Sequence, residues 1–351
     1  MASITKPKIY TQKLERNAIG LTRLDYEGGM STLCAGCGHD SITAAVVQAF
    51  FELALPPHRA VKLSGIGCSS KTTAYFVSQA HGFNSVHGRM PAVASGANAA
   101  QRDLTYIGIS GDGDSLSIGL GQLCHAIRRN VNMLYVLENN GVYGLTKGQF
   151  SASSDLGSKS KKGEPNQETS IDPASLALAL GATFVARSFS GDKEQLVPIL
   201  KAGLKHRGFA FVDVLSPCVT FNDHEGSTKS YTFIRKSKQE VVSTGFVPLA
   251  DEIAAQYPAG SVRPVVMHDG STVYLRKVDA SYDPKDQAGA FAYLKERQAK
   301  GEVATGLLYM KEDSADLHAR EKSVATPMRD LPFASLCPGT GALDALMDEY
   351  L

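Results

Sequence analysis

The sequence predicts an α/β fold, with a doubly wound, mostly parallel sheet followed by a C-terminal α+β extension. Helix-like and strand-like segments alternate from about residue 40 to 218, and glycine-rich turns follow the ends of apolar runs. This alternation is typical of parallel strands joined by helices that cover both faces of a sheet. With 43% hydrophobic residues among 351, the chain can bury one large core or two modest ones.

The first elements follow from periodicity and from their boundaries. Residues 40–55 are typical of a helix, and 61–65 of a strand that ends in the turn GIGCSS. A second strand is expected at 104–110 and a third at 131–137. Between them, 116–127 has apolar residues at helical spacing, at positions 116, 120, 123 and 127. Two more helix and strand pairs complete the predicted sheet.

A long polar segment interrupts this alternation. Residues 150–171 contain almost nothing apolar. We expect a surface loop there, either mobile or ordered only by a ligand or partner, because long loops of this kind often act as lids.

The alternation weakens beyond about residue 235. A hairpin is expected around Asp269-Gly270, then a charged helix over 284–300 and a short strand at TGLLYM. We therefore divide the chain into an N-terminal arm (1–30), the main domain (31–235) and an extension of unknown role (236–351).

Charge and hydropathy exclude several classes of partner. Lysine plus arginine (36) nearly balances aspartate plus glutamate (35), so no nucleic-acid partner is expected. No run approaches the roughly 18 apolar residues of a membrane span, and the N-terminus has no signal-like apolar region, so we expect a cytoplasmic protein with no membrane contact. Six cysteines are too few for a disulfide scaffold at this length.

The first candidate site joins two strand ends. GDGDSLSIGLGQ begins after the second strand, and LENNGVYG ends the third. A right-handed crossover places both ends on one edge of the sheet, so Asp112 and Asn140 can face each other. A carboxylate, an amide oxygen and a nearby carbonyl suit Mg²⁺ or Ca²⁺. The glycines beside Asp112 would let a diphosphate approach the backbone.

The second candidate site consists of thiols. Cys34 and Cys37 form a C-x-x-C pair, Cys68 lies in the turn after the first strand, and Cys218 follows the apolar run FAFVDVLSP. Four thiolates suit a [4Fe–4S] cluster or a structural zinc, although the C-x-x-C pair alone could be a redox dithiol or two unconnected thiols. We expect Cys124 to be a small core residue and Cys337 to be incidental.

Taken together, these motifs resemble a known family. Gly-Asp-Gly followed after about thirty residues by Asn-Asn resembles the thiamine-diphosphate motif. LCAGCGHD, KLSGIGCSS, HGRMPAVASGAN, GDGDSLSIGLGQ, LENNGVYGLTKGQ and DVLSPC occur in the order seen in β subunits of 2-oxoacid:ferredoxin oxidoreductases. The resemblance covers roughly residues 30–235, and GIGCSSK and HGFNSVHGRMP are most similar to the 2-oxoglutarate type.

The resemblance implies roles for named residues. The magnesium ligands would be Asp112, the Asn140 side chain and the Val142 carbonyl, and one [4Fe–4S] cluster would be held by Cys34, Cys37, Cys68 and Cys218. Thiamine-diphosphate pocket positions would be Ile66, Gly67, Cys68, Ser69, His87, Gly113, Asp114, Asn140, Gly144 and Leu145.

The implied reaction is oxidative decarboxylation of 2-oxoglutarate to succinyl-CoA and CO₂, with electrons passed to ferredoxin. The cofactor carries the chemistry and the protein binds and orients. No second doubly wound unit is evident, so an α subunit that contacts the pyrimidine end of the cofactor is expected, in an α₂β₂ heterotetramer. Lys71, His87 and Arg89 are candidate contacts for a dicarboxylate substrate, whereas His39 is assigned no role.

Other functions stay open at this point. Pyruvate or a branched-chain 2-oxoacid could replace 2-oxoglutarate as the substrate. A non-oxidative thiamine-dependent decarboxylase or carboligase would leave the thiols with zinc or nothing. A non-catalytic iron–sulfur electron carrier would bind no diphosphate at Asp112.

Overall fold

The computed structural model describes residues 14–160, 163–247, 262–266, 272–277, 282–337 and 339–350. Over this part of the chain the main sheet is 10-stranded, in the order β10-β11-β9-β12-β7-β8-β4-β3-β1-β2. The strands are β1 (Ala60–Ser64), β2 (His81–Asn84), β3 (Thr105–Gly111), β4 (Met133–Asn139), β7 (Phe184–Phe189), β8 (Phe209–Leu215), β9 (Lys238–Val247), β10 (Val262–Val266), β11 (Thr272–Lys277) and β12 (Val303–Met310). A small antiparallel pair, β5 (Val142–Tyr143) and β6 (Gln149–Phe150), lies outside it.

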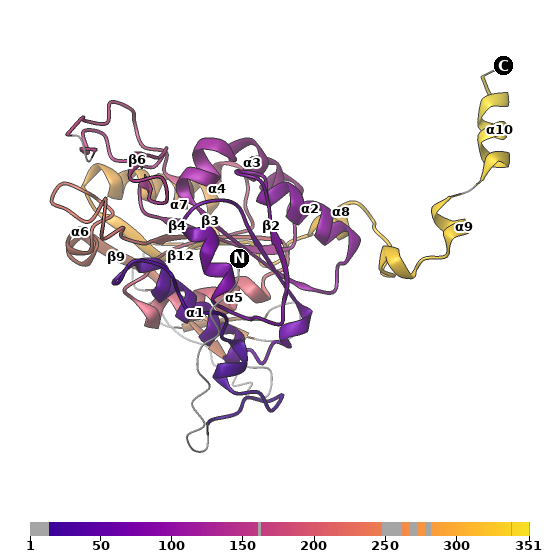
Figure 1. Cartoon of the computed structure of the whole chain (residues 1–351), viewed down its shortest axis with the longest axis horizontal. Helices are drawn as coiled ribbons and strands as arrows, with labels where there is room; N and C mark the ends of the chain where they lie inside the picture. Colours follow the sequence, from indigo (N-terminus) through magenta and orange to yellow (C-terminus); the bar gives the residue numbers. More distant parts are fainter. Residues whose placement is uncertain are drawn as a thin grey trace.

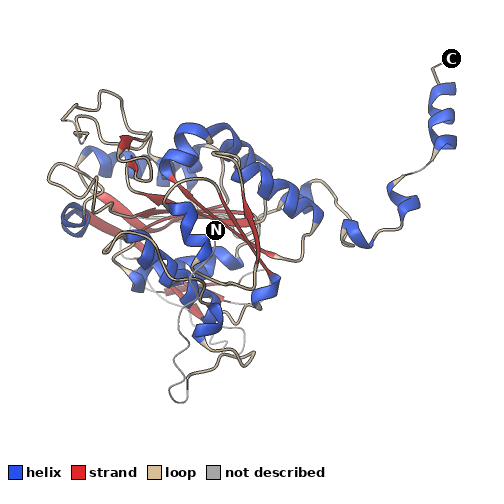
Figure 2. Ribbon diagram, in the orientation of Figure 1, coloured by secondary structure: helices blue, strands red, loops and turns tan. Residues whose placement is uncertain are grey.

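The sheet is entirely parallel from β7 to β2. In it β1 pairs with β2 and β3, β4 pairs with β3 and β8, and β8 pairs with β7. Figure 1 and Figure 2 show helices on both sides of the sheet. On one side α1 (Gly38–Glu52) packs on α5 (Lys193–Lys205), and on the other α2 (Met90–Ala100) packs on α3 (Leu120–Arg129). The predicted doubly wound α/β class is confirmed.

The remaining helices are short or peripheral. They are α4 (Pro173–Ala179), α6 (Tyr231–Ser237), α7 (Gln287–Ala299), α8 (Leu317–Arg320), α9 (Phe333–Leu336) and α10 (Thr340–Asp348). The short 3₁₀ or π-type segments are η1 (Arg23–Tyr26), η2 (Pro57–Arg59), η3 (Ser69–Ala74), η4 (Gly113–Ile118) and η6 (Met328–Asp330). Of the helices described, none is long and apolar enough to cross a membrane.

Strands β4 and β8 form the centre of the core, and every residue of both is buried. Tyr135 and Phe211 stack across them, with ring centroids 5.9 Å apart. Buried polar side chains appear toward the carboxyl ends of these strands, at Glu138, Asn139 and Asp213. Because a buried polar group is costly without a partner, this edge of the sheet is built for contacts other than simple packing.

The helix predicted over 116–127 is divided in the structure. A π-type turn, η4, runs from Gly113 to Ile118, and the regular helix α3 begins at Leu120. Gly119 lies between them, and a Cβ built there would be only 2.7 Å from the carbonyl oxygens of Gly88 and Asp114. The close approach of the Gly88 loop therefore interrupts the helix.

The extension adds strands to the same sheet. β12 pairs antiparallel with β7 and contains the predicted TGLLYM strand, and α7 coincides with the helix predicted over 284–300. The expected hairpin is present as the antiparallel pair β10 and β11, while its turn at Asp269-Gly270 lies outside the described residues.

After α8 the chain leaves the body as a tail that carries α9 and α10 (Figure 1). Every described residue from 332 to 350 is exposed, including Phe333 and Tyr350.

Candidate functional site

The first candidate site forms where β3 and β4 end. Asp112 follows β3 and Asn140 follows β4, and the Asn140 amide donates to Asp112 Oδ1 at 3.3 Å. Asn140 Oδ1 accepts the amide of Val142 at 3.0 Å. The structure thus brings together the three residues predicted to hold a metal.

A cavity opens beside these residues. It encloses about 500 Å³ of empty space, a volume that includes solvent at its open mouth. Its lining contains every predicted pocket residue: Ile66, Gly67, Cys68, Ser69, His87, Gly113, Asp114, Asn140, Gly144 and Leu145. Asp112, Val142, Tyr143, Thr146, Gly111 and His39 complete it.

Two of the candidate substrate contacts lie elsewhere. Arg89 donates to Gln122 Oε1 at 3.1 Å on the exposed side of the α2–α3 layer. Lys71 is half-buried in η3 and does not line the cavity. Of the three candidates only His87 lines it.

The glycines around Asp112 serve internal packing. A Cβ on Gly113 would lie 2.5 Å from the Tyr143 ring, and one on Gly111 would lie 2.8 Å from the Ser69 hydroxyl. The sequence analysis explained these two glycines by the close approach of a diphosphate to the backbone. In the structure, side chains of the cavity wall already occupy the space beside both glycines.

The Asp114 carboxylate accepts hydrogen bonds from three different parts of the chain. Its Oδ1 accepts from His87 Nδ1, from the Gly88 amide at 2.7 Å and from the Ile66 amide at 3.2 Å. Its Oδ2 accepts from the Ser110 hydroxyl at 2.6 Å. These donors saturate the carboxylate, so Asp114 shapes the cavity and orients the His87 ring.

The sequence analysis missed two serines. Ser151 and Ser153 both donate to Asp112 Oδ2, and Ser153 does so at 2.7 Å. Burial raises the pKa of Asp112, while the two hydroxyls act in the opposite direction. Both serines belong to the polar segment expected to be a surface loop, yet both are buried. That expectation was wrong for the start of the segment, and only the run Ser-Ala-Ser-Ser-Asp after β6 could have signalled it.

The predicted cysteines converge on the same edge of the sheet. A Cβ built on Gly144 would be 3.4 Å from Cys68 Sγ and 3.8 Å from Cys218 Sγ. The Thr220 hydroxyl lies 3.6 Å from Cys34 Sγ, and Cys37 precedes α1. Burial raises the pKa of the Cys37 thiol to about 12 and also raises those of Cys68 and Cys218.

These thiols do not form a compact site for one ion. Within the described ranges, no three His, Cys, Asp or Glu side chains are grouped closely enough to hold a metal ion. Cys337 is exposed in the tail, and Cys124 is half-buried rather than a full core residue. Because Leu123, Ala126 and Ile127 form the buried face of α3, Cys124 lies at the margin of that face.

A buried acid lies beside both sites. Glu138 is fully buried at the end of β4, and its carboxyl oxygens have no hydrogen-bond partner among the described residues. Burial raises its pKa well above the usual range. His39 Nδ1 lies 3.4 Å from Glu138 Oε2 but bonds to the Ser216 hydroxyl at 2.6 Å. Burial lowers the pKa of His39 to about 4, so its imidazole is neutral at pH 7.

Comparisons with known proteins agree with this geometry. Residues 65–214 match the family model described as "Thiamine pyrophosphate enzyme, C-terminal TPP binding domain". The fold is similar to that of a 2-oxoglutarate:ferredoxin oxidoreductase from Magnetococcus marinus, solved with 2-oxoglutarate, coenzyme A and succinyl-CoA bound. The TM-score is 0.70 at 30% identity, over 88% of this chain and 92% of that one.

Three curated relatives define the family. The chain is 45% identical over 199 residues to a 2-oxoacid:ferredoxin oxidoreductase subunit beta from Saccharolobus solfataricus, covering 56% of this chain and 65% of the relative. It is 44% identical to the 2-oxoglutarate oxidoreductase subunit KorB of Mycobacterium tuberculosis, covering 54% and 51%. The 2-oxoglutarate synthase subunit KorB of Methanocaldococcus jannaschii is 35% identical, with 54% and 69% covered. The chain thus spans less than two thirds of the length of the first two relatives. Because it covers 69% of the third relative at 35% identity, it belongs to the family of 2-oxoacid:ferredoxin oxidoreductase β subunits.

Proposed function

We propose that this chain is the thiamine-diphosphate-binding subunit of an enzyme that oxidatively decarboxylates 2-oxoglutarate. Coenzyme A takes the succinyl group, and ferredoxin takes the electrons. The substrate proposal is supported by the 2-oxoglutarate names of two relatives and of the similar structure.

Magnesium and the diphosphate would be held at the first candidate site. Asp112, Asn140 Oδ1 and the Val142 carbonyl are hard oxygen donors of the type Mg²⁺ prefers. Asp112 also fits a cation because it is a buried carboxylate whose pKa is raised by burial. Bound thiamine diphosphate would supply the electron sink for decarboxylation. The residues of the cavity wall bind it, orient it and limit the access of water.

A [4Fe–4S] cluster would be held by Cys34, Cys37, Cys68 and Cys218. Four thiolates suit a [4Fe–4S] cluster as well as a structural zinc, and the ferredoxin oxidoreductase names of a relative and of the similar structure favour the cluster. Raised thiol pKa values mean that binding must displace protons. The observation that carries the proposal is the position of Gly144, which lines the cofactor cavity and where a Cβ would lie 3.4 Å from Cys68 Sγ and 3.8 Å from Cys218 Sγ.

A partner α subunit would complete the active site. The described residues contain one doubly wound sheet, which offers one half of a thiamine site. A glutamate from the partner would activate the aminopyrimidine end of the cofactor, and two copies of each subunit would form an α₂β₂ assembly. His87, oriented by Asp114, is the residue of this chain that we assign to substrate contact.

The test uses the chain purified anaerobically with its partner subunit. Coenzyme A is added, and the visible absorbance of the cluster is followed as 2-oxoglutarate or pyruvate is supplied. Bleaching by 2-oxoglutarate alone supports the whole proposal, and bleaching by pyruvate alone overturns the substrate assignment. A colourless, inert complex would overturn the oxidative reaction and favour the non-oxidative thiamine enzyme. Cys34→Ala should remove the cluster while thiamine diphosphate still binds, because Cys34 does not line the cavity.

A further inference from the structure

The carboxylate of Asp112 is held from one side by the polar segment 151–155. Its Oδ2 accepts the hydroxyls of Ser151 and Ser153, whereas the Asn140 amide contacts Oδ1 at a longer 3.3 Å. Two donors on one oxygen fix the rotation of the carboxylate group. Oδ1 is then the oxygen best placed to accept a further, stronger ligand.

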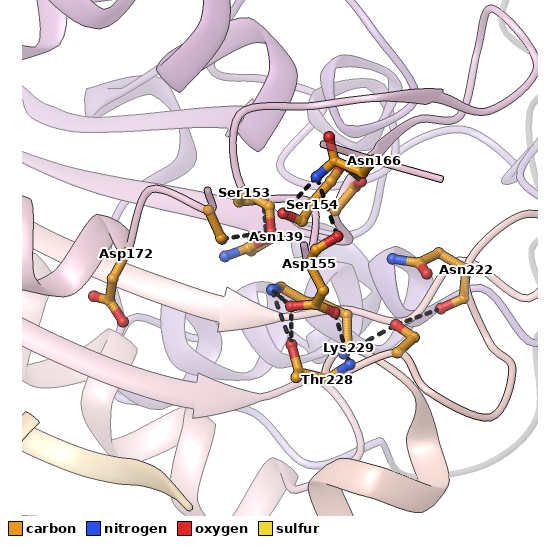
Figure 3. A network of polar contacts seen from close by, with 12 residues as sticks. Asn139, Ser153, Ser154, Asp155, Asn166, Asp172, Asn222, Thr228 and Lys229 are labelled. Atoms are coloured by element: carbon orange, nitrogen blue, oxygen red, sulfur yellow. Dashed lines mark hydrogen bonds and ion pairs between the residues drawn. The ribbon is translucent and has the colours of Figure 1, made fainter. Parts of the chain in front are cut away.

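The serines are themselves held in place by neighbours within the segment. Ser154 Oγ accepts the Ser151 amide at 2.8 Å and donates to the Gly141 carbonyl. Asn166 Nδ2 donates to the Ser154 carbonyl at 3.3 Å and to the Asp155 carbonyl at 3.1 Å (Figure 3). Ser153 also donates to Asn139 Oδ1 at 2.9 Å, which ties it to the end of β4. These hydrogen bonds hold both serines against the end of β4 and the backbone that follows it.

An ion pair anchors the far end of the segment. Asp155 Oδ1 lies 2.8 Å from Lys229 Nζ, and the two side chains are 15% and 9% exposed. The Thr228 amide and hydroxyl also donate to Asp155, at 2.8 and 2.6 Å (Figure 3). Residues 228 and 229 follow Cys218 in the same stretch of chain, and Asn222 in that stretch donates to the Asn140 carbonyl at 2.8 Å. The ion pair thus joins the wall of the metal site to the segment that carries the fourth cysteine.

We propose that Ser151 and Ser153 are positioning residues, which fix the orientation of the Asp112 carboxylate as a ligand for the metal–diphosphate. The Asp155–Lys229 ion pair keeps the segment that carries both serines in place. The inference rests on the proposed function only in taking Asp112 to be a metal ligand. Residues that orient a metal ligand typically change metal affinity by about 10–100-fold when removed.

The first test measures thiamine-diphosphate binding as a function of Mg²⁺ concentration, by calorimetry on the complex with its partner subunit. We expect the double variant Ser151→Ala/Ser153→Ala to need at least about tenfold more Mg²⁺ for half-maximal binding. Ser154→Ala is the matched control, because its hydroxyl belongs to the same segment but does not contact Asp112. Its Mg²⁺ requirement should change less than that of the double variant.

The second test removes the ion pair. Lys229→Met should also raise the Mg²⁺ concentration needed for half-maximal binding. Lys229→Arg keeps the positive charge, so it should need nearly the same Mg²⁺ concentration as the wild type. Lys201→Met is the control, since Lys201 forms a comparable 2.7 Å ion pair with Glu52 far from the site. Iron content and the thermal unfolding midpoint are recorded for each variant, which separates a loss of positioning from a loss of folding.

The outcomes separate the two proposals. A wild-type Mg²⁺ dependence in the folded double serine variant overturns the inference while the proposed function stands. Equal shifts in Ser154→Ala and the double variant overturn the direct role of the two hydroxyls, because loss of a contact within the segment would then have the same effect as loss of both bonds to Asp112. If the wild-type complex itself binds no thiamine diphosphate with Mg²⁺, both the inference and the proposed function are overturned.

Discussion

Segment 151–155 and the C-terminal tail reverse the usual relation between hydropathy and burial. The first is Ser-Ala-Ser-Ser-Asp, yet Ser151, Ser153 and Ser154 are buried. The tail presents apolar side chains, and Phe333 is 78% and Tyr350 83% exposed. The polar segment can be buried because nearly every hydroxyl finds a partner, and the apolar tail is exposed because no part of the described body packs over it (Figure 1). Burial here is decided by available partners.

The largest expected effect comes from breaking the anchor of the polar segment. Lys229→Met leaves Asp155 as a buried carboxylate without its cation, which typically costs about 3–5 kcal/mol for a buried pair. Chemical unfolding of the chain should show this loss. Lys201→Met should cost clearly less, because its partner Glu52 is 34% exposed and can be solvated. Equal losses in the two variants would mean that the segment is not specially dependent on its ion pair.

A second prediction concerns the close packing at the same edge of the sheet. Gly113→Ala places a Cβ 2.5 Å from the Tyr143 ring, and overpacking of this kind typically costs about 1–3 kcal/mol. Gly121→Ala, on α3, meets no atom within 4 Å and should be neutral or stabilising by up to about 1 kcal/mol. The unfolding midpoint of Gly113→Ala should therefore fall, whereas that of Gly121→Ala should stay unchanged or rise. A neutral Gly113→Ala would contradict the packing described for the cavity wall.

A third prediction uses pH. Burial acts to raise the pKa of Asp172, but Arg187 and the Ser175 amide outweigh it, so the pKa is lowered. A lowered pKa in the folded state stabilises the fold above the ordinary aspartate pKa of about 3.9, and that stabilisation is lost as pH falls through the lowered value.

Asp172→Asn keeps a side chain that can cap α4 but removes the charge that pairs with Arg187. At pH 7 it should be less stable than the wild type by about 1 kcal/mol. The difference should shrink below about pH 4. A difference that is constant from pH 7 to 3 in urea unfolding would argue against a charge effect.

The smallest effect is expected in the tail. Truncation after Leu331 removes exposed side chains that contribute little to the core, so the free energy of unfolding of the chain should change by less than about 0.5 kcal/mol. The unfolding midpoint, compared with that of the intact chain, is the measurement. A large drop in stability would show that the tail packs on the body and would remove the contrast with segment 151–155.

Much of the candidate site could be predicted from local patterns. Asp112 and Asn140 each follow a buried strand, and parallel topology brings such strand ends together. The pocket positions were implied by the family resemblance, and all of them line one cavity in the structure. Lys71 and Arg89 were chosen for charge alone, and charge does not say where a long side chain points.

The sequence by itself determined the fold class, the strands β1, β3 and β4, and the meeting of Asp112 with Asn140, because periodicity and strand-end motifs are local. Only the tertiary structure decided that Ser151 and Ser153 hold Asp112, that Asp114 orients His87 and that Lys229 pairs with Asp155. These contacts join residues 27 to 74 positions apart in the chain. A polar side chain has no periodic pattern that identifies its partner, so its burial depends on what the folded chain brings within hydrogen-bonding distance.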